Sequence, residues 1–321
     1  MKILLLLPLI IFSIITFPQT LEGVNPEHLV TQVAYQSTKA HGLKDGLLVQ
    51  KIALKTGVTL DYVEKGNKTG TPVIFLHGLT DSWHSFESVF ATLPSSVRGF
   101  AITQRGHGDS EKPAEGYTPR EFAADVAAFI RQKSLGSAII VGHSMGGIHA
   151  QQFALSYPKL VKGIVIIDSD PAFKDNPGMK EFYQEAMTMK GKFSRDYMDG
   201  FQKSTIANPI DSAYYRVIVA EGMKTPVRVF QSVLSGIMQV DFVPQLKNIQ
   251  CPVLVLWGDK DAFCIRKGQD LMTTHLKKAK LVIYEGIGHA LHWEEPKRFV
   301  NDLMQFIQLV QLNGGETNIK K

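Results

Sequence analysis

Residues 138–148, AIIVGHSMGGI, decide the fold class of this chain. The apolar run 138–141 predicts a strand that is covered on both faces, and a helical pattern begins near Gly146. Between them, Gly142-His143-Ser144-Met145-Gly146 predicts a sharp strand-to-helix turn that exposes Ser144. Such a turn crowds the positions two before and two after the serine, and both are glycines. An ordinary helix N-cap serine would not need them, so we interpret Ser144 as a nucleophile.

On both sides of this turn, short apolar runs alternate with longer amphipathic segments. The expected strands are 47–54, 58–64, 72–76, 99–103, 138–141, 161–167, 252–257 and 280–284, and the expected helices are 119–133, 146–157, 268–277 and 296–312. The first two strands flank Lys55-Thr56-Gly57 and predict a β-hairpin. The alternation predicts an α/β fold with a mostly parallel central sheet and helices on both faces.

Residues 173–245 break this rhythm and predict a helical cap inserted between two parts of the core, 46–172 and 246–312. The segment is rich in methionine and aromatic residues: Met179, Phe182, Tyr183, Met187, Tyr197, Phe201, Tyr214, Tyr215, Phe230 and Met238. At helical spacing such residues more often form the core of a cap than the wall of a pocket. Those left over favour a small or medium apolar group in the site. Residues 21–45 are a lead-in, and the polar tail 313–321 is expected to be disordered.

A serine hydroxyl is a weak nucleophile at neutral pH and needs a histidine base. The chain order Ser, then acid, then His is expected for this turn. His289 follows the expected strand 280–284 and Gly288, so it is the candidate base. His292, three residues on, is the competitor.

The base in turn needs a carboxylate to fix its tautomer. Asp261 is the candidate, because it follows the strand 252–257 at its carboxyl end, where functional groups gather in parallel sheets. Asp259, Asp168 and Asp170 also follow strand ends and are the alternatives.

The negative oxygen formed during acyl transfer needs backbone N–H donors. Met145 follows the serine and is expected to supply one. Leu79, in the His77-Gly78-Leu79 stretch after a strand, is expected to supply the other, although His77-Gly78 alone could be a simple turn. This chemistry requires no metal and no organic cofactor.

Lys2 and the apolar run 3–17 predict that residues 1–20 are a secretory signal or an N-terminal anchor. The chain is therefore expected to be exported, periplasmic or secreted, with membrane attachment only if this segment is retained. The net charge of +5 is spread along the chain, which gives no reason to expect nucleic acid as a partner. Cys251 and Cys264 are expected to stay unpaired, because the strand between them separates them by ~20 Å.

These motifs together resemble the α/β-hydrolase superfamily from about residue 47 to 312. Members typically carry a strand ending in His-Gly, an Arg-Gly-x-Gly-x-Ser stretch as at 105–110, the serine turn, Gly-Asp-x-Asp as at 258–261 and Gly-His-x-x-His-Trp-Glu-x-Pro as at 288–296. Gln104 departs from relatives, which often have Asp there.

The resemblance implies a triad of Ser144, Asp261 and His289, with Leu79 and Met145 as the oxyanion hole. A serine in the turn argues against epoxide hydrolases and haloalkane dehalogenases, which use aspartate. The leading expectation is a serine esterase acting on a small apolar ester. A lactonase, a cofactor-free perhydrolase and a ligand receptor with slow hydrolysis are the alternatives.

Overall fold

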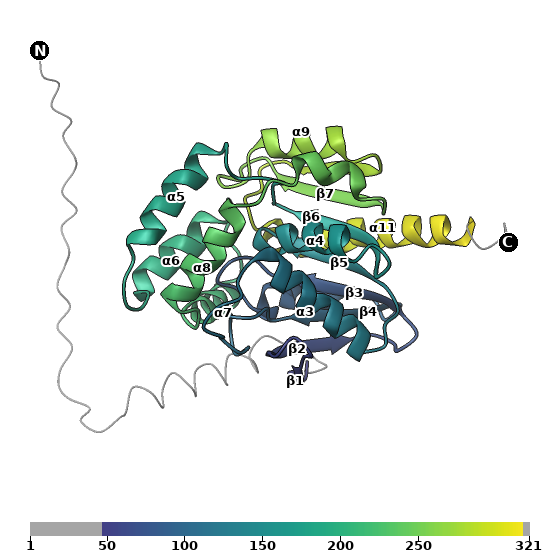
Figure 1. The fold of residues 1–321 in the computed structure, drawn as a ribbon, viewed down its shortest axis with the longest axis horizontal. Coiled ribbons are helices and arrows are strands. Elements are labelled where there is room, and N and C mark those ends of the chain that lie inside the picture. The colour runs from purple at the N-terminus through teal and green to yellow at the C-terminus, as the bar shows by residue number, and fades with distance from the viewer. Residues whose placement is uncertain (1–46, 317–321) are drawn as a thin grey trace, which may run out of the picture. The chain divides into compact units, whose positions relative to one another are not determined.

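Eight strands form a sheet in the order β1-β2-β4-β3-β5-β6-β7-β8 (Figure 1). The computed structural model describes residues 47–316. The strand bounds are β1 Gln50–Ala53, β2 Thr59–Lys65, β3 Thr71–Leu76, β4 Val97–Ile102, β5 Ala138–His143, β6 Val161–Ile167, β7 Val253–Gly258 and β8 Ala279–Tyr284. The pairs β1·β2 and β2·β4 are antiparallel and every later pair is parallel. The predicted α/β fold with a mostly parallel sheet is therefore confirmed.

The predicted hairpin is also present, since β1 and β2 pair directly and Gly57 in the connecting turn has φ +86°. The strand before the serine turn is longer than predicted. β5 continues to His143 because Gly142 pairs with Leu76 of β3, and His143 pairs with Ile167 of β6. The turn therefore begins at Ser144 itself.

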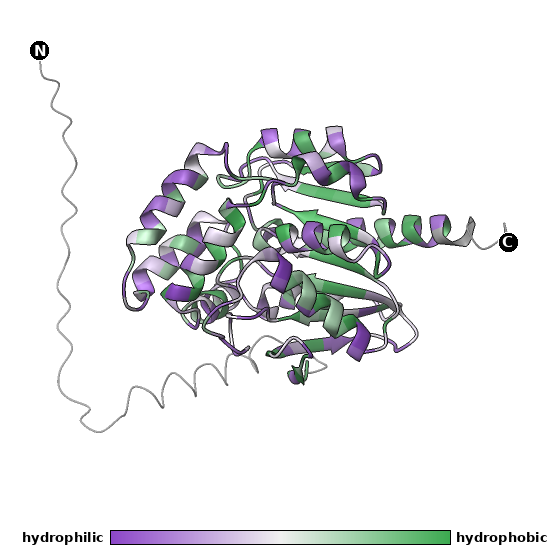
Figure 2. Ribbon diagram, in the orientation of Figure 1, coloured by the Kyte–Doolittle hydropathy of each residue, from purple (hydrophilic) through white to green (hydrophobic). Residues whose placement is uncertain are grey.

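Helices cover both faces of the sheet (Figure 1). They are α2 Glu87–Thr92, α3 Pro119–Gln132, α4 Met145–Ser156, α9 Arg266–His275, α10 Leu291–Glu294 and α11 Pro296–Glu316. Neighbouring strand residues alternate between two cores, with Ile74 in the larger core beneath α3 and α4, and Val73 and Phe75 in the core beneath α2 and α11. The central strands are accordingly the most uniformly hydrophobic part of Figure 2.

Four α-helices lie between β6 and β7, inside the segment predicted to be a cap, and the 3₁₀ helix Val243–Asn248 follows them. The four α-helices are α5 Pro177–Thr188, α6 Arg195–Ser204, α7 Ser212–Gly222 and α8 Val227–Met238. Side chains cap three of their N-termini, because Asn176, Ser194 and Asp211 each accept a hydrogen bond from a backbone N–H of the first turn. These helices pack beside the carboxyl ends of the strands (Figure 1).

The sequence did not predict the short helices before β4. A 3₁₀ turn, Trp83–Phe86, leads into α2, and Ser82 caps it by accepting a hydrogen bond from the His84 N–H. These two pieces are too short to produce a readable period.

The C-terminal helix corrects a second prediction, because α11 reaches Glu316 and so includes the start of the tail expected to be disordered from residue 313. A polar turn can extend a helix whose earlier turns are anchored by packing. The predicted signal or anchor 1–20 and lead-in 21–45 lie outside the described residues. Among residues 47–316, no helix is both long and apolar enough to cross a bilayer. Cys251 and Cys264 are both free, as predicted.

Candidate active site

Ser144 stands at the junction of β5 and α4 in a strained backbone conformation. Its φ is +52° and its ψ is −114°, a combination that costs free energy for a residue with a side chain. The surrounding structure enforces it, because the Ser144 N–H donates to Ile167 O and the Ser169 hydroxyl donates to Ser144 O. The serine is thus fixed at the carboxyl end of the central strands.

The flanking glycines are required by close backbone contact. A Cβ on Gly142 would lie 2.1 Å from Gly146 O, and a Cβ on Gly146 would lie 2.2 Å from Leu76 O. Neither neighbour is a movable side chain, so any larger residue would displace the turn. This is the crowding inferred from the sequence.

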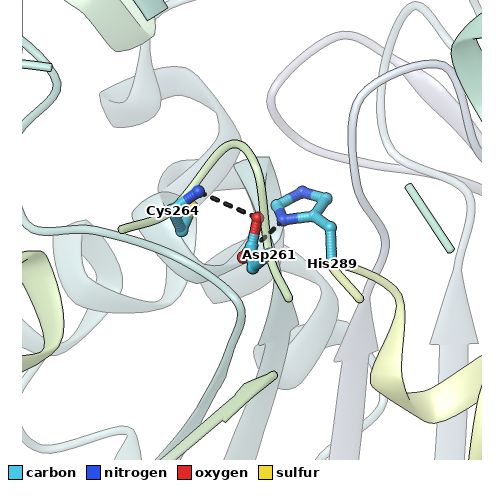
Figure 3. Close-up of side chains that lie close together, drawn as sticks. All are labelled: Asp261, Cys264 and His289. Atoms are coloured by element: carbon cyan, nitrogen blue, oxygen red, sulfur yellow. Dashed lines mark hydrogen bonds and ion pairs between the residues drawn. The ribbon is translucent and has the colours of Figure 1, made fainter. Parts of the chain in front are cut away.

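His289 and Asp261 are joined directly. His289 Nδ1 lies 2.8 Å from Asp261 Oδ2, and both side chains are nearly fully buried (Figure 3). The other carboxylate oxygen accepts from the N–H groups of Phe263 and Cys264 at 2.7 and 2.9 Å. Since the carboxylate only accepts, the neutral imidazole carries its proton on Nδ1, which leaves the Nε2 lone pair available as a base.

The competing acids are held elsewhere. Asp168 accepts from the N–H groups of Gly258 and Leu291, and burial followed by the nearby Asp261 raises its pKa well above the ordinary range. Asp170 accepts from Gln269, and burial raises its pKa to about 8. Asp259 accepts from the Gly286 N–H and is partly exposed.

The competing histidine has a separate partner as well. His292 Nε2 lies 3.1 Å from Ser85 Oγ, and the ring is fully buried. Burial lowers its pKa to about 3. His292 therefore remains neutral and is bound to Ser85, away from Asp261.

A single cavity contains the remaining predicted groups, because Leu79, Ser144, Met145 and His289 all line it. Met145 is the first residue of α4, where the amide has no carbonyl partner within the helix. Within residues 47–316 no hydrogen bond joins Ser144 Oγ to His289, so these two groups share the cavity without being paired.

The cap and the core each contribute about half of the cavity wall, and the wall is mostly apolar. Of the methionine and aromatic residues noted in the sequence, Met179, Phe182 and Phe201 line it, and the others do not. The cavity volume is about 40 Å³, which is room for roughly three water molecules.

One side of this apolar cavity is polar, and sequence analysis did not identify its residues. Asp81, Gln202 and Thr205 line it, and the Gln202 amide donates to Thr80 Oγ1 at 3.0 Å and lies 3.4 Å from Asp81 Oδ1. Gln202 comes from α6, so this contact depends on the cap reaching the loop after β3. The one sequence feature that pointed to this polar side was Asp81, an acidic residue shortly after the end of β3.

Asp261, Cys264 and His289 also place potential metal ligands within 4.8 Å of one another. Hydrogen bonds already occupy these groups: Asp261 binds His289, and the Cys264 thiol donates to Asp168 O at 3.2 Å. Burial, followed by the nearby carboxylates, raises the pKa of Cys264 well above its usual range. A thiol that resists ionisation is a poor metal ligand, so the set fits a hydrogen-bonded site better than a metal site.

Comparison with known proteins identifies the family of this chain. Residues 71–296 match the family model described as the alpha/beta hydrolase fold. The chain is 27% identical over 267 residues to 2-(acetamidomethylene)succinate hydrolase of Mesorhizobium japonicum, covering 78% of this chain and 92% of that protein. It is also 27% identical over 278 residues to the bifunctional esterase/perhydrolase DCH of Acinetobacter calcoaceticus, covering 80% and 99%.

Among solved structures, the esterase RhEst1 from Rhodococcus sp. ECU1013 superposes with a TM-score of 0.73 at 25% identity, covering 81% of this chain and 98% of that one.

Proposed function

The chain belongs to the α/β-hydrolase family, and from that premise we propose that it hydrolyses a small carboxylic ester through an acyl intermediate on Ser144. The observation that carries this proposal is the shared cavity of Ser144 and His289, with His289 held by Asp261 at 2.8 Å. The names of the relatives, which include an esterase, support the same reaction class.

The proposed reaction uses His289 first as a base and then as an acid. When substrate brings the groups together, Nε2 of His289 takes the Ser144 hydroxyl proton, and the serine oxygen attacks the acyl carbon. The N–H groups of Leu79 and Met145 meet the resulting oxyanion. The C–O bond to the alcohol then breaks, His289 returns the proton to that alcohol, and the acyl group remains on Ser144.

The second half repeats these steps with water. His289 takes a proton from the water, the hydroxide oxygen attacks the acyl-serine, and the acid leaves as the Ser144 hydroxyl recovers its proton. Asp261 keeps Nδ1 protonated throughout and stabilises the imidazolium.

A fluorophosphonate probe tests this proposal directly. We expect stoichiometric labelling of Ser144, located by peptide mapping, and steady turnover of short p-nitrophenyl esters after an initial burst. Labelling at another residue would contradict the assignment of the nucleophile. Tight binding of an ester without turnover would favour a ligand receptor instead.

Perhydrolysis is a second candidate, favoured by similarity to a relative named as a bifunctional esterase/perhydrolase. Hydrogen peroxide would replace water in the second half and release a peracid from the same acyl-serine. Assays with an ester in the presence and absence of peroxide separate the two activities. A panel of lactones tests the lactonase alternative, in which the same serine opens a ring.

We also propose export of the chain, on the basis of Lys2 and the apolar run 3–17. N-terminal sequencing of the mature protein tests this. A new N-terminus near residue 20 would support a cleaved signal, whereas an intact Met1 in the membrane fraction would indicate a retained anchor.

A further inference from the structure

Asp81 is a buried carboxyl group on the wall of the candidate active site. Only 2% of the residue is exposed, and it lines the same cavity as Ser144 and His289. It lies two residues after Leu79, the proposed oxyanion donor. Asp81 and the proposed donors Leu79 and Met145 line one cavity, so a charge on Asp81 would act within the space where the oxyanion forms.

The direct hydrogen-bond partners of this carboxyl group are neutral. The Ser85 hydroxyl lies 3.2 Å from Oδ2, and the Gln202 amide nitrogen lies 3.4 Å from Oδ1. The Gly78 carbonyl accepts from the Asp81 backbone N–H. In the described part of the chain, no lysine or arginine forms an ion pair with Asp81.

His143 faces Asp81 from β5, with Nδ1 3.8 Å from Oδ2. The opposite nitrogen, Nε2, lies 2.9 Å from the carbonyl oxygen of His289. A carbonyl only accepts, so Nε2 carries the proton and the neutral ring presents a bare lone pair at Nδ1. Within residues 47–316 this buried Nδ1 has no hydrogen-bond partner, so it is an acceptor facing the carboxyl group.

Among the titratable groups near Asp81, His289 acts as a positive charge that lowers the pKa of Asp81, but burial outweighs it. Burial, followed by repulsion from His292 and His289, holds the pKa of His143 well below its usual range. His292 reaches Asp81 only through Ser85. Burial, followed by the nearby acidic groups Glu87 of α2 and Asp81, raises the pKa of Tyr214 of α7 well above its usual range.

We propose that Asp81 is a second titrating group of this site, protonated in the active form, and that its ionisation beside the oxyanion hole limits the reaction at alkaline pH. The inference rests on the proposed ester hydrolysis. A protonated Asp81 can direct its O–H toward His143 Nδ1 and leaves the cavity uncharged. An ionised Asp81 places a negative charge beside a second one forming on the substrate.

The effect falls within the range in which an enzyme is assayed, because burial raises the pKa of Asp81 to about 7, against smaller opposing contributions from Ser85, Gln202 and His289. In a water-poor cavity, repulsion between two such charges is expected to slow acyl transfer by on the order of 10- to 100-fold.

The test is the pH dependence of kcat/KM between about pH 5 and about pH 10 for the wild type and Asp81→Asn. We expect the wild-type value to fall above about pH 7 by on the order of 10-fold or more, and the fall to be absent in Asp81→Asn. Asp81→Ser is a second uncharged variant in case the amide disturbs folding. An alkaline fall that persists in both variants would overturn the proposal.

Asp170→Asn is the matched control. Asp170 is also a buried carboxyl group, with a pKa raised to about 8 by burial and then by Asp261, but it lines a separate cavity beside α9. We expect kcat/KM of this variant to fall at alkaline pH as it does in the wild type. If Asp170→Asn removes the fall and Asp81→Asn does not, the titrating group is Asp170 and the proposal is wrong.

Infrared spectroscopy of the carboxylic acid C=O stretch observes the proton without using turnover. A band that disappears around pH 7 in the wild type and is missing in Asp81→Asn would support the proposal, and its absence at about pH 5 would overturn it. Fluorophosphonate labelling at about pH 6 separates the two proposals. Unlabelled Ser144 would reject the proposed hydrolysis, whereas normal labelling with an unchanged pH profile in Asp81→Asn would reject only the role of Asp81.

Discussion

The loops at the carboxyl end of the sheet and the helices of the cap build the two sides of one cavity by different means. Backbone contacts hold the loops: Ser144 is fixed through its own N–H and C=O, and Asp261 through two backbone N–H donors. Side-chain packing forms the cap wall, where the Phe182 and Phe201 rings lie nearly parallel with centroids 5.8 Å apart. Backbone-held groups tolerate little change, whereas a packed wall can be remodelled.

The two regions meet at the histidine loop. Glu294 of α10 accepts from the N–H groups of Gly288 and Asn208, and the Ala290 N–H donates to Thr205 O. Asn208 and Thr205 belong to the junction between α6 and α7. The cap is therefore anchored next to His289.

The largest expected effect is the loss of the nucleophile. Ser144→Ala should reduce ester turnover by at least ~10⁴-fold, because only binding and the oxyanion donors would remain. Steady-state kinetics with a p-nitrophenyl ester measure this. Ser156→Ala, at the exposed end of the same helix, is the control and should retain wild-type activity; a similar loss in both variants would show that α4 itself is being damaged.

The second-largest expected effect is the loss of Asp261, the acid proposed to orient His289. Asp261→Asn keeps the shape but can favour the wrong imidazole tautomer, and a loss of ~10³- to 10⁴-fold in kcat is expected. Asp259→Asn, a change two residues earlier in the same loop, should reduce kcat much less. If the order of these two losses were reversed, Asp259 would be the functional acid.

Asp81 should make folding stability depend on pH. Its pKa in the folded protein is about 7, above the ordinary 3.8, so the folded chain retains a proton that the unfolded chain has lost. The stabilisation is complete below about pH 4 and is lost as the pH rises through about 7, a change of roughly 4 kcal/mol. Urea unfolding at both ends of this range measures it.

Comparison with Asp81→Asn isolates the contribution of this carboxyl group, because all other titrating groups are shared. The variant should show a shallower fall in unfolding free energy between pH 4 and pH 7. If the unfolding free energies of the two proteins depended on pH in the same way, Asp81 would ionise in the folded state as it does in water.

The smallest expected effect concerns the cap wall. Phe201→Ala should enlarge the cavity and shift kcat/KM by about 10-fold in favour of longer or branched acyl chains, with little change in fluorophosphonate labelling of Ser144. A panel of esters of increasing acyl length measures the shift. Tyr215→Phe, a cap change outside the cavity wall, is the control; an unchanged preference in Phe201→Ala would mean that the wall does not select substrate.

Much of the sheet end could be predicted because its signals are local. Gly142 and Gly146 flank Ser144 for a steric reason visible in five residues, and the strand before them is continuously apolar. His289 and Asp261 follow strand ends in the expected order. The fold class follows from the same alternation of strands and helices.

What the sequence could not predict depends on distant segments meeting. Asp81 is part of the site only because α6 brings Gln202 and β5 brings His143 beside it. Likewise, the cap sequence did not show that Met179, Phe182 and Phe201, rather than Tyr197 or Phe230, would face the cavity. The helix α2 was missed because six residues give too little periodicity to read.

The volume of the cavity has a consequence for the timing of catalysis. If the substrate is an ester larger than this volume, lining side chains of the cap, such as Phe182 and Phe201, would have to move aside to admit it and to release the product. For bulky substrates, admission and product escape would then set kcat, and the rate would respond to solvent viscosity. For the smallest esters, the chemical steps at Ser144 would be limiting instead.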